Sequence, residues 1–133
     1  MLFALCALLF GLLVQAAPVA AQTARQIVFF NECARPLRLM ISHANRPQGW
    51  HPHAWWSFEP NERAYLAVDG QRLMQLDDHA IYFLAEATDG SGVVWSGEDH
   101  ATQWDGQRYS LRRAVTGVVD GDLEIRLACE ARR

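Results

Sequence analysis

Short segments in which apolar and polar residues alternate constrain the fold of this chain more than any other feature. In residues 36–42 (PLRLMIS), leucine or isoleucine occupies every second position. A period of two places successive side chains on opposite faces of a β-strand. Since no segment sustains the 3.6-residue period of an amphipathic helix, the pattern predicts a protein built from β-strands.

Several segments share this strand-like character: 26–32, 36–42, 63–68, 71–76, 80–87, 93–98, 107–114 and 123–130. Turn-forming residues separate them in clusters at 46–49, 60–61, 69–70, 89–92, 105–106 and 120–122. We therefore expect an all-β fold, a small antiparallel sandwich or barrel of about eight short strands. The alternative is a sheet that carries one short helix, with residues 62–76 as the helical segment.

The N-terminal 21 residues have the pattern of a secretory signal peptide. Residues 2–14 form an apolar run, and Val19 and Ala21 supply small residues before a cleavage point at Gln22. The run is too short to span a bilayer comfortably, although an uncleaved N-terminal anchor is the alternative. We predict an exported protein, located in the periplasm with an extracellular location as the alternative, and with residues 22–133 as a single exported β domain.

Cleavage would remove Cys6 and leave two cysteines, Cys33 and Cys129. An even number of cysteines in an exported chain predicts a disulfide, because an oxidising compartment does not leave both thiols free. This bond would join the terminal strands, which otherwise fray. A pair of metal ligands is the alternative, but it needs more soft partners nearby than the sequence offers.

The charge pattern argues against two classes of partner. All 12 basic residues are arginines, and the net charge is −3 at pH 7. Acidic and basic residues alternate without a basic run, so nucleic acid and anionic membrane surfaces are poor partners. An unknown protein, a glycan or a small ligand is expected instead.

The segment GWHPHAWW (49–56) combines histidines and tryptophans. In an extended segment His51 and His53 point the same way, so the pair can offer two imidazoles to one zinc or copper ion. Pro52 favours that extended geometry. A third ligand would come from elsewhere in the chain: His43, His79, His100 or the Asp77–Asp78 pair.

The tryptophans of the same segment support a second hypothesis. Exposed indoles stack on sugars and on aromatic or cationic ligands, so Trp50, Trp55 and Trp56 are candidate ligand-binding residues. Trp55 and Trp56 are adjacent and must point to opposite faces if they lie in a strand. The competing interpretation is that the indoles are chiefly core residues and hydrogen-bonded anchors.

No catalytic motif is found. The adjacency of Ser42 and His43 is not a nucleophile–base geometry, and no free cysteine remains after the disulfide. A hydrolase would need two facing carboxylates, for which the sequence offers only scattered glutamates: Glu59, Glu62, Glu86 and Glu98.

The order Asn31-x-Cys33, Pro36, Trp50, Trp55-Trp56, Pro60 and IYFLAEA (81–87) resembles an uncharacterised family of exported bacterial domains. That family has an Asn-x-Cys start, a Gly-Trp-Trp-x-x-x-Pro-Gly centre and a Tyr-x-Tyr-Ala-Glu-like strand. The resemblance covers residues 27–97. It departs at Ala54 and Asn61, where the family has glycine, at Phe83 and Leu84 in the tyrosine motif, and in lacking an extra cysteine. The resemblance implies an exported β-rich domain and no assigned activity.

The sequence thus favours a non-catalytic exported binding module that uses the 50–58 loop to contact a protein, glycan or small ligand. The alternatives are a periplasmic zinc or copper protein centred on His51 and His53, and a hydrolase with a carboxylate pair.

Overall fold

The chain folds into β-strands in the parts described by its computed structural model, which are residues 13–17, 23–46 and 49–129. No helix occurs in these residues, so none is long and apolar enough to cross a membrane. The all-β expectation is confirmed, and the alternative of a helix over residues 62–76 is wrong. Apart from residues 13–17, the predicted signal peptide falls outside the described residues.

The strands are β1 (Ala24–Asn31), β2 (Leu37–His43), β3 (His51–Phe58), β4 (Arg63–Tyr65), β5 (Ala67–Val68), β6 (Gln71–Arg72), β7 (Met74–Leu76), β8 (Tyr82–Ala87), β9 (Val94–Trp95), β10 (His100–Trp104), β11 (Gln107–Arg113), β12 (Thr116–Val119) and β13 (Asp122–Leu127). All eight predicted segments contain strands. The strand number was too low because two segments are each split in two and because β3, β10 and β12 were not predicted.

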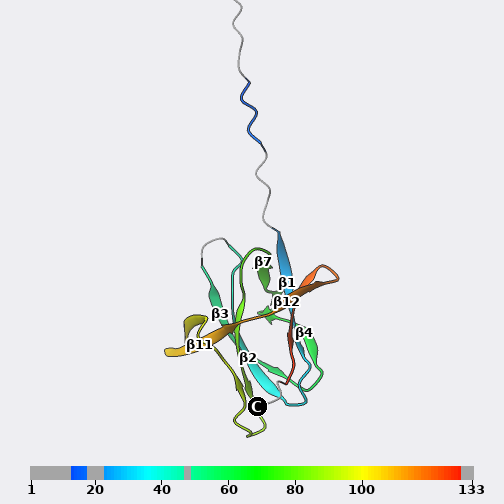
Figure 1. Cartoon of the computed structure of the whole chain (residues 1–133), viewed down its shortest axis with the longest axis vertical. Helices are drawn as coiled ribbons and strands as arrows, with labels where there is room; N and C mark the ends of the chain where they lie inside the picture. The colour runs from blue at the N-terminus through cyan, green and yellow to red at the C-terminus, as the bar shows by residue number, and fades with distance from the viewer. Residues whose placement is uncertain (1–12, 18–22, 47–48, 130–133) are drawn as a thin grey trace, which may run out of the picture.

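Two sheets pack face to face as a β-sandwich (Figure 1). The first sheet has the order β12-β13-β1-β4, with β7 also paired to β1, and the second has the order β10-β11-β8-β2-β3, with β9 paired to β8. A small hairpin, β5–β6, stands apart from both sheets. The segment that contains the tryptophan pair is therefore strand β3 rather than a loop, and it lies at the end of the strand order of its sheet.

The terminal strands β1 and β13 run parallel, whereas every other pairing is antiparallel. A parallel pair cannot be closed by a tight turn and needs a long connection. Here nearly the whole domain lies between the two strands, so the parallel arrangement is allowed.

Three Asp-Gly dipeptides make the tight hairpins of the fold. Asp69, Asp105 and Asp120 have φ angles of 51°, 50° and 51°, and the glycine that follows each also has a positive φ. Two consecutive residues with positive φ form a type I′ turn, whose twist matches paired strands. These turns close the hairpins β5–β6, β10–β11 and β12–β13, as the turn clusters in the sequence predicted.

Buried side chains form two clusters on opposite faces of the second sheet. The main core lies between the sheets and includes Ile27, Phe29, Leu39, Ile41, Phe83 and Ile125. The second cluster centres on Met40, Leu84 and Leu111, with the partly buried rings of Trp55, Tyr82, Trp104 and Tyr109 around it. It forms because β10 lies against β3, which curls this sheet into a half-barrel. Met40, on the polar face of its strand in the sequence pattern, is consequently fully buried.

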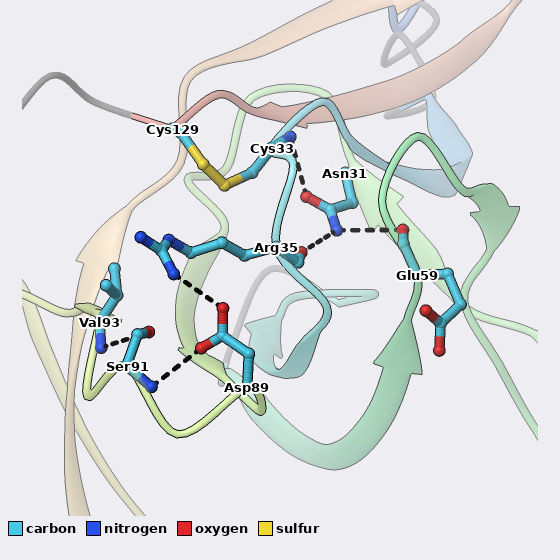
Figure 2. Close-up of a disulfide and its surroundings, with 8 residues drawn as sticks. All are labelled: Asn31, Cys33, Arg35, Glu59, Asp89, Ser91, Val93 and Cys129. Atoms are coloured by element: carbon cyan, nitrogen blue, oxygen red, sulfur yellow. Dashed lines mark hydrogen bonds and ion pairs between the residues drawn. A yellow bond between two sulfur atoms is a disulfide. The ribbon is translucent and has the colours of Figure 1, made fainter.

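A disulfide joins Cys33, just after β1, to Cys129, just after β13, with their Cα atoms 4.6 Å apart (Figure 2). The predicted link between the terminal strands is confirmed. The buried side chain of Asn31 lies next to this bond: its amide nitrogen donates to the carbonyls of Arg35 and Glu59, and its oxygen accepts from the Cys33 amide.

Candidate functional site

Three histidines gather at the end of the sandwich opposite the disulfide. β2 ends at His43 and β3 begins at His51, and these two residues are paired across the strands; His53 is paired with Ile41. Paired residues and residues two apart point to the same face, so the three imidazoles share one face. The ring centroid of His43 lies 5.1 Å from that of His53 and 6.3 Å from that of His51.

His43 is the buried member of this group, with only 2% of the residue exposed. Its Nδ1 lies 2.7 Å from the carbonyl oxygen of Met74. Because a carbonyl only accepts, Nδ1 carries the proton and donates, which leaves a lone pair on Nε2 of the neutral ring. Burial lowers the pKa of His43 to about 4, so the ring is neutral at pH 7.

The other two histidines differ in exposure. His53 is half-buried, and burial lowers its pKa, with a further lowering from the nearby charge of His51. His51 is exposed at the first position of β3. The pair therefore presents one constrained and one freely accessible imidazole beside the buried ring of His43.

These imidazoles line a groove of about 820 Å³, which we call the histidine groove. Its opposite wall comes from the β5–β6 hairpin and the start of β7. The lining residues are His43, Asn45, Arg46, His51, Pro52, His53, Val68, Asp69, Gln71, Arg72, Leu73 and Met74. Three separate parts of the chain thus meet around one concave space.

One charged group on the wall of the groove is held in place by its neighbours. The guanidinium of Arg72 donates to the side-chain oxygen of Gln26 at 2.9 Å and lies 3.6 Å over the ring of Tyr65. Stacking and hydrogen bonding together restrict the rotamers of this long side chain. Arg72 therefore lines the groove while its guanidinium is held by Gln26 and Tyr65.

The remaining two histidines lie outside the groove. His100 has its Nε2 atom 3.2 Å from the hydroxyl of Ser42, and its ring stacks on Tyr82 at 4.6 Å. His79 pairs with Asp78 and lies 5.6 Å from the ring of Trp50, measured between centroids. The third-ligand candidates His79, His100 and the Asp77–Asp78 pair are thus not lining residues, whereas His43 is.

No group of three or more His, Cys, Asp or Glu side chains in the described ranges stands ready to hold a metal ion. The structure does place His51 and His53 side by side on the groove, as the His-x-His spacing suggested.

The candidate tryptophans make contacts within the fold. The indole nitrogen of Trp50 donates to the Ala80 carbonyl, and that of Trp56 donates to the Ala67 carbonyl. Trp55 packs against the second cluster and Trp56 against the main core, so the two rings occupy opposite faces. The sheet register shifts beside them, between Leu39 and Met40, and the peptide bond between Ala54 and Trp55 is cis.

Trp55 has two close ring contacts. The guanidinium of Arg38 lies 3.9 Å above its ring, and Tyr109 meets it edge-on with centroids 5.7 Å apart. Arg38 is itself paired with Glu86 at 2.6 Å. The indoles at 50, 55 and 56 are all partly buried, as is His53, which leaves His51 as the exposed ring of this segment.

Two of the four glutamates considered for catalysis have side-chain contacts within the fold. Glu86 pairs with Arg38, and a carboxylate oxygen of Glu62 accepts from the Glu59 amide. The Ser42 hydroxyl is near an imidazole, that of His100, but Ser42 is fully buried and cannot meet a substrate. This proximity therefore serves packing.

Sequence reasoning missed the wall of the groove formed by residues 68–74. The Asp69–Gly70 pair predicted a turn at this point. The local sequence pattern did not predict that the β5–β6 hairpin lies across the groove from β3. That placement depends on contacts between residues far apart in the chain.

Comparison with protein-family models, with curated proteins and with solved structures finds no significant match for this chain. The resemblance to an exported bacterial domain family therefore remains a prediction from short motifs. The function has to be argued from the geometry.

Proposed function

We propose that this protein is a non-catalytic exported binding module that holds a small ligand in the histidine groove. The observation that carries the proposal is the groove itself, which brings the accessible histidines of the tryptophan-rich segment together with the β5–β6 hairpin. In this proposal the binding segment is the one predicted from sequence, but its histidines rather than its indoles face the ligand.

The size and lining of the groove support this proposal. Small-molecule sites are concave spaces of about 300–1,000 Å³ with a few placed polar groups on partly apolar walls. The groove, at about 820 Å³, combines the apolar residues Pro52, Val68 and Leu73 with imidazoles and the held guanidinium of Arg72. The groove therefore offers both hydrogen-bond donors and hydrogen-bond acceptors, which suits a polar organic ligand.

The tryptophans support the proposal indirectly. Trp50 and Trp56 tie the two ends of the His51–Trp56 region to the backbone at Ala80 and Ala67. A binding site held by rigid neighbours loses less conformational entropy when the ligand arrives. In this proposal the indoles position the histidines instead of stacking on the ligand.

Export is part of the same proposal. The apolar N-terminal run has the form of a signal peptide, and the disulfide between Cys33 and Cys129 is of the kind that persists in an oxidising compartment. N-terminal sequencing of the protein recovered from a bacterial periplasm should begin at Gln22. Retention of residues 1–21 would contradict cleavage.

The binding proposal is tested by nuclear magnetic resonance of the isotope-labelled, metal-free protein. A library of small polar fragments and a panel of soluble oligosaccharides are titrated in the presence of EDTA. We expect amide shifts confined to His43, Asn45, Arg46, His51, His53 and the 68–74 segment, because these line the groove. A panel in which no compound shifts these amides contradicts the proposal.

The chain contains its own matched control. The tetrapeptide Asp-Gly-Gln-Arg occurs twice, at 69–72 beside the groove and at 105–108 in the β10–β11 hairpin. Gln71 and Gln107 are both exposed and both open a strand after a type I′ turn. Gln71→Trp should fill the groove and abolish the shifts, whereas Gln107→Trp should leave them. Equal binding by both variants would place the ligand elsewhere.

A further inference from the structure

We propose that His43, His51 and His53 form a three-imidazole site for a zinc or copper ion at the floor of the histidine groove. This inference rests on the groove of the proposed function and gives it a specific ligand chemistry. It differs from the simple His-x-His hypothesis because a buried third histidine, supplied by the neighbouring strand, completes the set.

The first support is the spacing of His43 and His53. Imidazole nitrogens bind zinc at about 2.0–2.1 Å, which places two ring centroids about 5 Å apart on a tetrahedral ion. The observed separation of 5.1 Å between these two rings matches that value. The strand register, which pairs His53 with the residue two before His43, holds the rings at this separation.

The second support is the fixed tautomer of His43. Metal-binding histidines almost always donate their other ring N–H to a carboxylate, a carbonyl or water, which orients the ring and raises its basicity. His43 does this through Nδ1, which donates to the Met74 carbonyl at 2.7 Å. Its Nε2 atom therefore has the lone pair that a metal needs, in a ring that the fold already orients.

The third imidazole has to move a short way. The centroid of His51 is 6.3 Å from that of His43, roughly 1 Å too far for a shared tetrahedral ion. This is consistent with the finding that no three such side chains are closed around one point in the described residues. His51 is exposed, so a rotamer change can bring it in without disturbing the core.

The type of ion follows from the ligands. Imidazole nitrogens suit zinc and copper, whereas magnesium and calcium take oxygen ligands. Three imidazoles leave a coordination position that faces the groove, which is open to water or to a bound organic ligand. A metal at this position would therefore sit where the proposed ligand binds.

The test uses Zn²⁺ and Cu²⁺, titrated separately into the oxidised protein after its metal has been removed with EDTA and dialysed away. We expect the thermal midpoint to rise with metal concentration, because an ion that binds the folded state stabilises it by mass action. The ring nitrogens of His43, His51 and His53 should shift together in spectra of the imidazoles. An unchanged midpoint in excess of both metals overturns the inference.

Variants locate the ion. His51→Ala and His53→Ala should each weaken binding by at least about tenfold, since even the contacts that orient metal ligands are worth 10–100-fold. His79→Ala removes a histidine from the same end of the fold but outside the groove, and it should bind metal as the parent protein does. Loss of binding in His79→Ala, or parent-like binding in the other two variants, overturns the assignment.

The two proposals fail separately. If organic compounds shift the groove amides in EDTA but neither metal binds, the groove stands as a binding site and the three-imidazole assignment is wrong. If metal binds through the three histidines but no organic compound does, the metal assignment stands without an organic ligand.

Discussion

The two ends of the sandwich are built from similar parts but are closed in different ways. At one end, the disulfide between Cys33 and Cys129 joins the segments that follow β1 and β13 (Figure 2). At the other end, where β2 stops at His43 and β3 starts at His51, only non-covalent contacts hold the chain. The seven residues of β2 span the distance between the two ends, roughly 20 Å at the rise of a strand.

Each end contains one fully buried carboxamide that satisfies three backbone groups. Asn31 accepts from the Cys33 amide and donates to the carbonyls of Arg35 and Glu59. Gln75 accepts from the Ala44 amide and donates to the carbonyls of His79 and Ala80. Both side chains lie beside irregular backbone. The buried N–H and C=O groups of that backbone would otherwise have no hydrogen-bond partners.

The two ends of the sandwich differ in how well they suit a binding site. The disulfide end is covalently cross-linked, and its exposed polar side chains pair with each other, as in the Arg35–Asp89 ion pair. The opposite end carries buried and half-buried imidazoles beside a groove. A site that adapts to a ligand is better placed at the end without the covalent link, because local rearrangement there costs less.

The largest effect is expected from removing the cross-link. Cys33→Ser combined with Cys129→Ser should lower the free energy of unfolding by about 4–5 kcal/mol on the chain-entropy model, because the bond closes a loop of nearly the whole domain. Urea denaturation of the oxidised parent and the variant measures it. If the variant unfolds with the same free energy as the parent, the disulfide does not stabilise its end of the sandwich.

Acidification should destabilise the protein through His43, at the end opposite the disulfide. The pKa of His43 is about 4 in the folded protein against 6.5 when exposed, so between these values the unfolded state binds a proton that the folded state does not. The contribution of His43 to the free energy of unfolding is complete above pH 6.5 and is lost as the pH falls towards 4. The loss is roughly 3 kcal/mol, at 1.36 kcal/mol per pKa unit.

The measurement is a series of denaturation curves from pH 7 to pH 4 in EDTA, for the parent and for His43→Gln, which does not titrate. The difference between the two proteins isolates His43 from the carboxylates that protonate over the same range. A difference that is constant with pH would show that His43 does not contribute.

Removal of the buried amides should distinguish the two ends directly. Asn31→Ala and Gln75→Ala each leave buried backbone groups unpaired and should each cost about 2 kcal/mol. Gln75→Ala should speed up amide hydrogen exchange at Ala44. Asn31→Ala should speed up exchange at Cys33 by less, because the disulfide still restrains Cys33. Equal acceleration at both sites would remove the distinction between the ends.

The smallest effect concerns the exposed Asp89 at the disulfide end. Hydrogen bonds from Ser91, and then from Arg35, lower the pKa of Asp89 to about 2. Arg35→Ala should raise this pKa only part of the way to its ordinary value, since the Ser91 contacts remain. A carboxyl titration by nuclear magnetic resonance reports it. A full return to the ordinary value would make Arg35 the dominant partner.

Local features account for what could be predicted. Alternation in residues 36–42 and 80–87 made those segments recognisable as strands, because a half-buried strand needs a period of two. The Asp-Gly pairs predicted turns, and the structure shows them as type I′ hairpins because both residue types accept a positive φ angle. β10 and β12 were missed because HATQW and TGVV have too few apolar residues to show the alternation.

The candidate site was only half predictable. His51 and His53 were found because their spacing is local, and His43 was considered only as one of several distant candidates. The His43–His51 pairing and the facing hairpin at 69–72 depend on register and packing across the fold.

The sequence by itself determined the strand-rich composition, the hairpin turns and the cysteine pair. These depend on the preferences of neighbouring residues and on the number of cysteines. Tertiary structure alone decided that β1 and β13 run parallel, that β2 is buried on both faces and that three histidines line one groove. Each of these depends on which distant strands pair and in which register, and the free energy of that choice comes from burial shared by the whole fold.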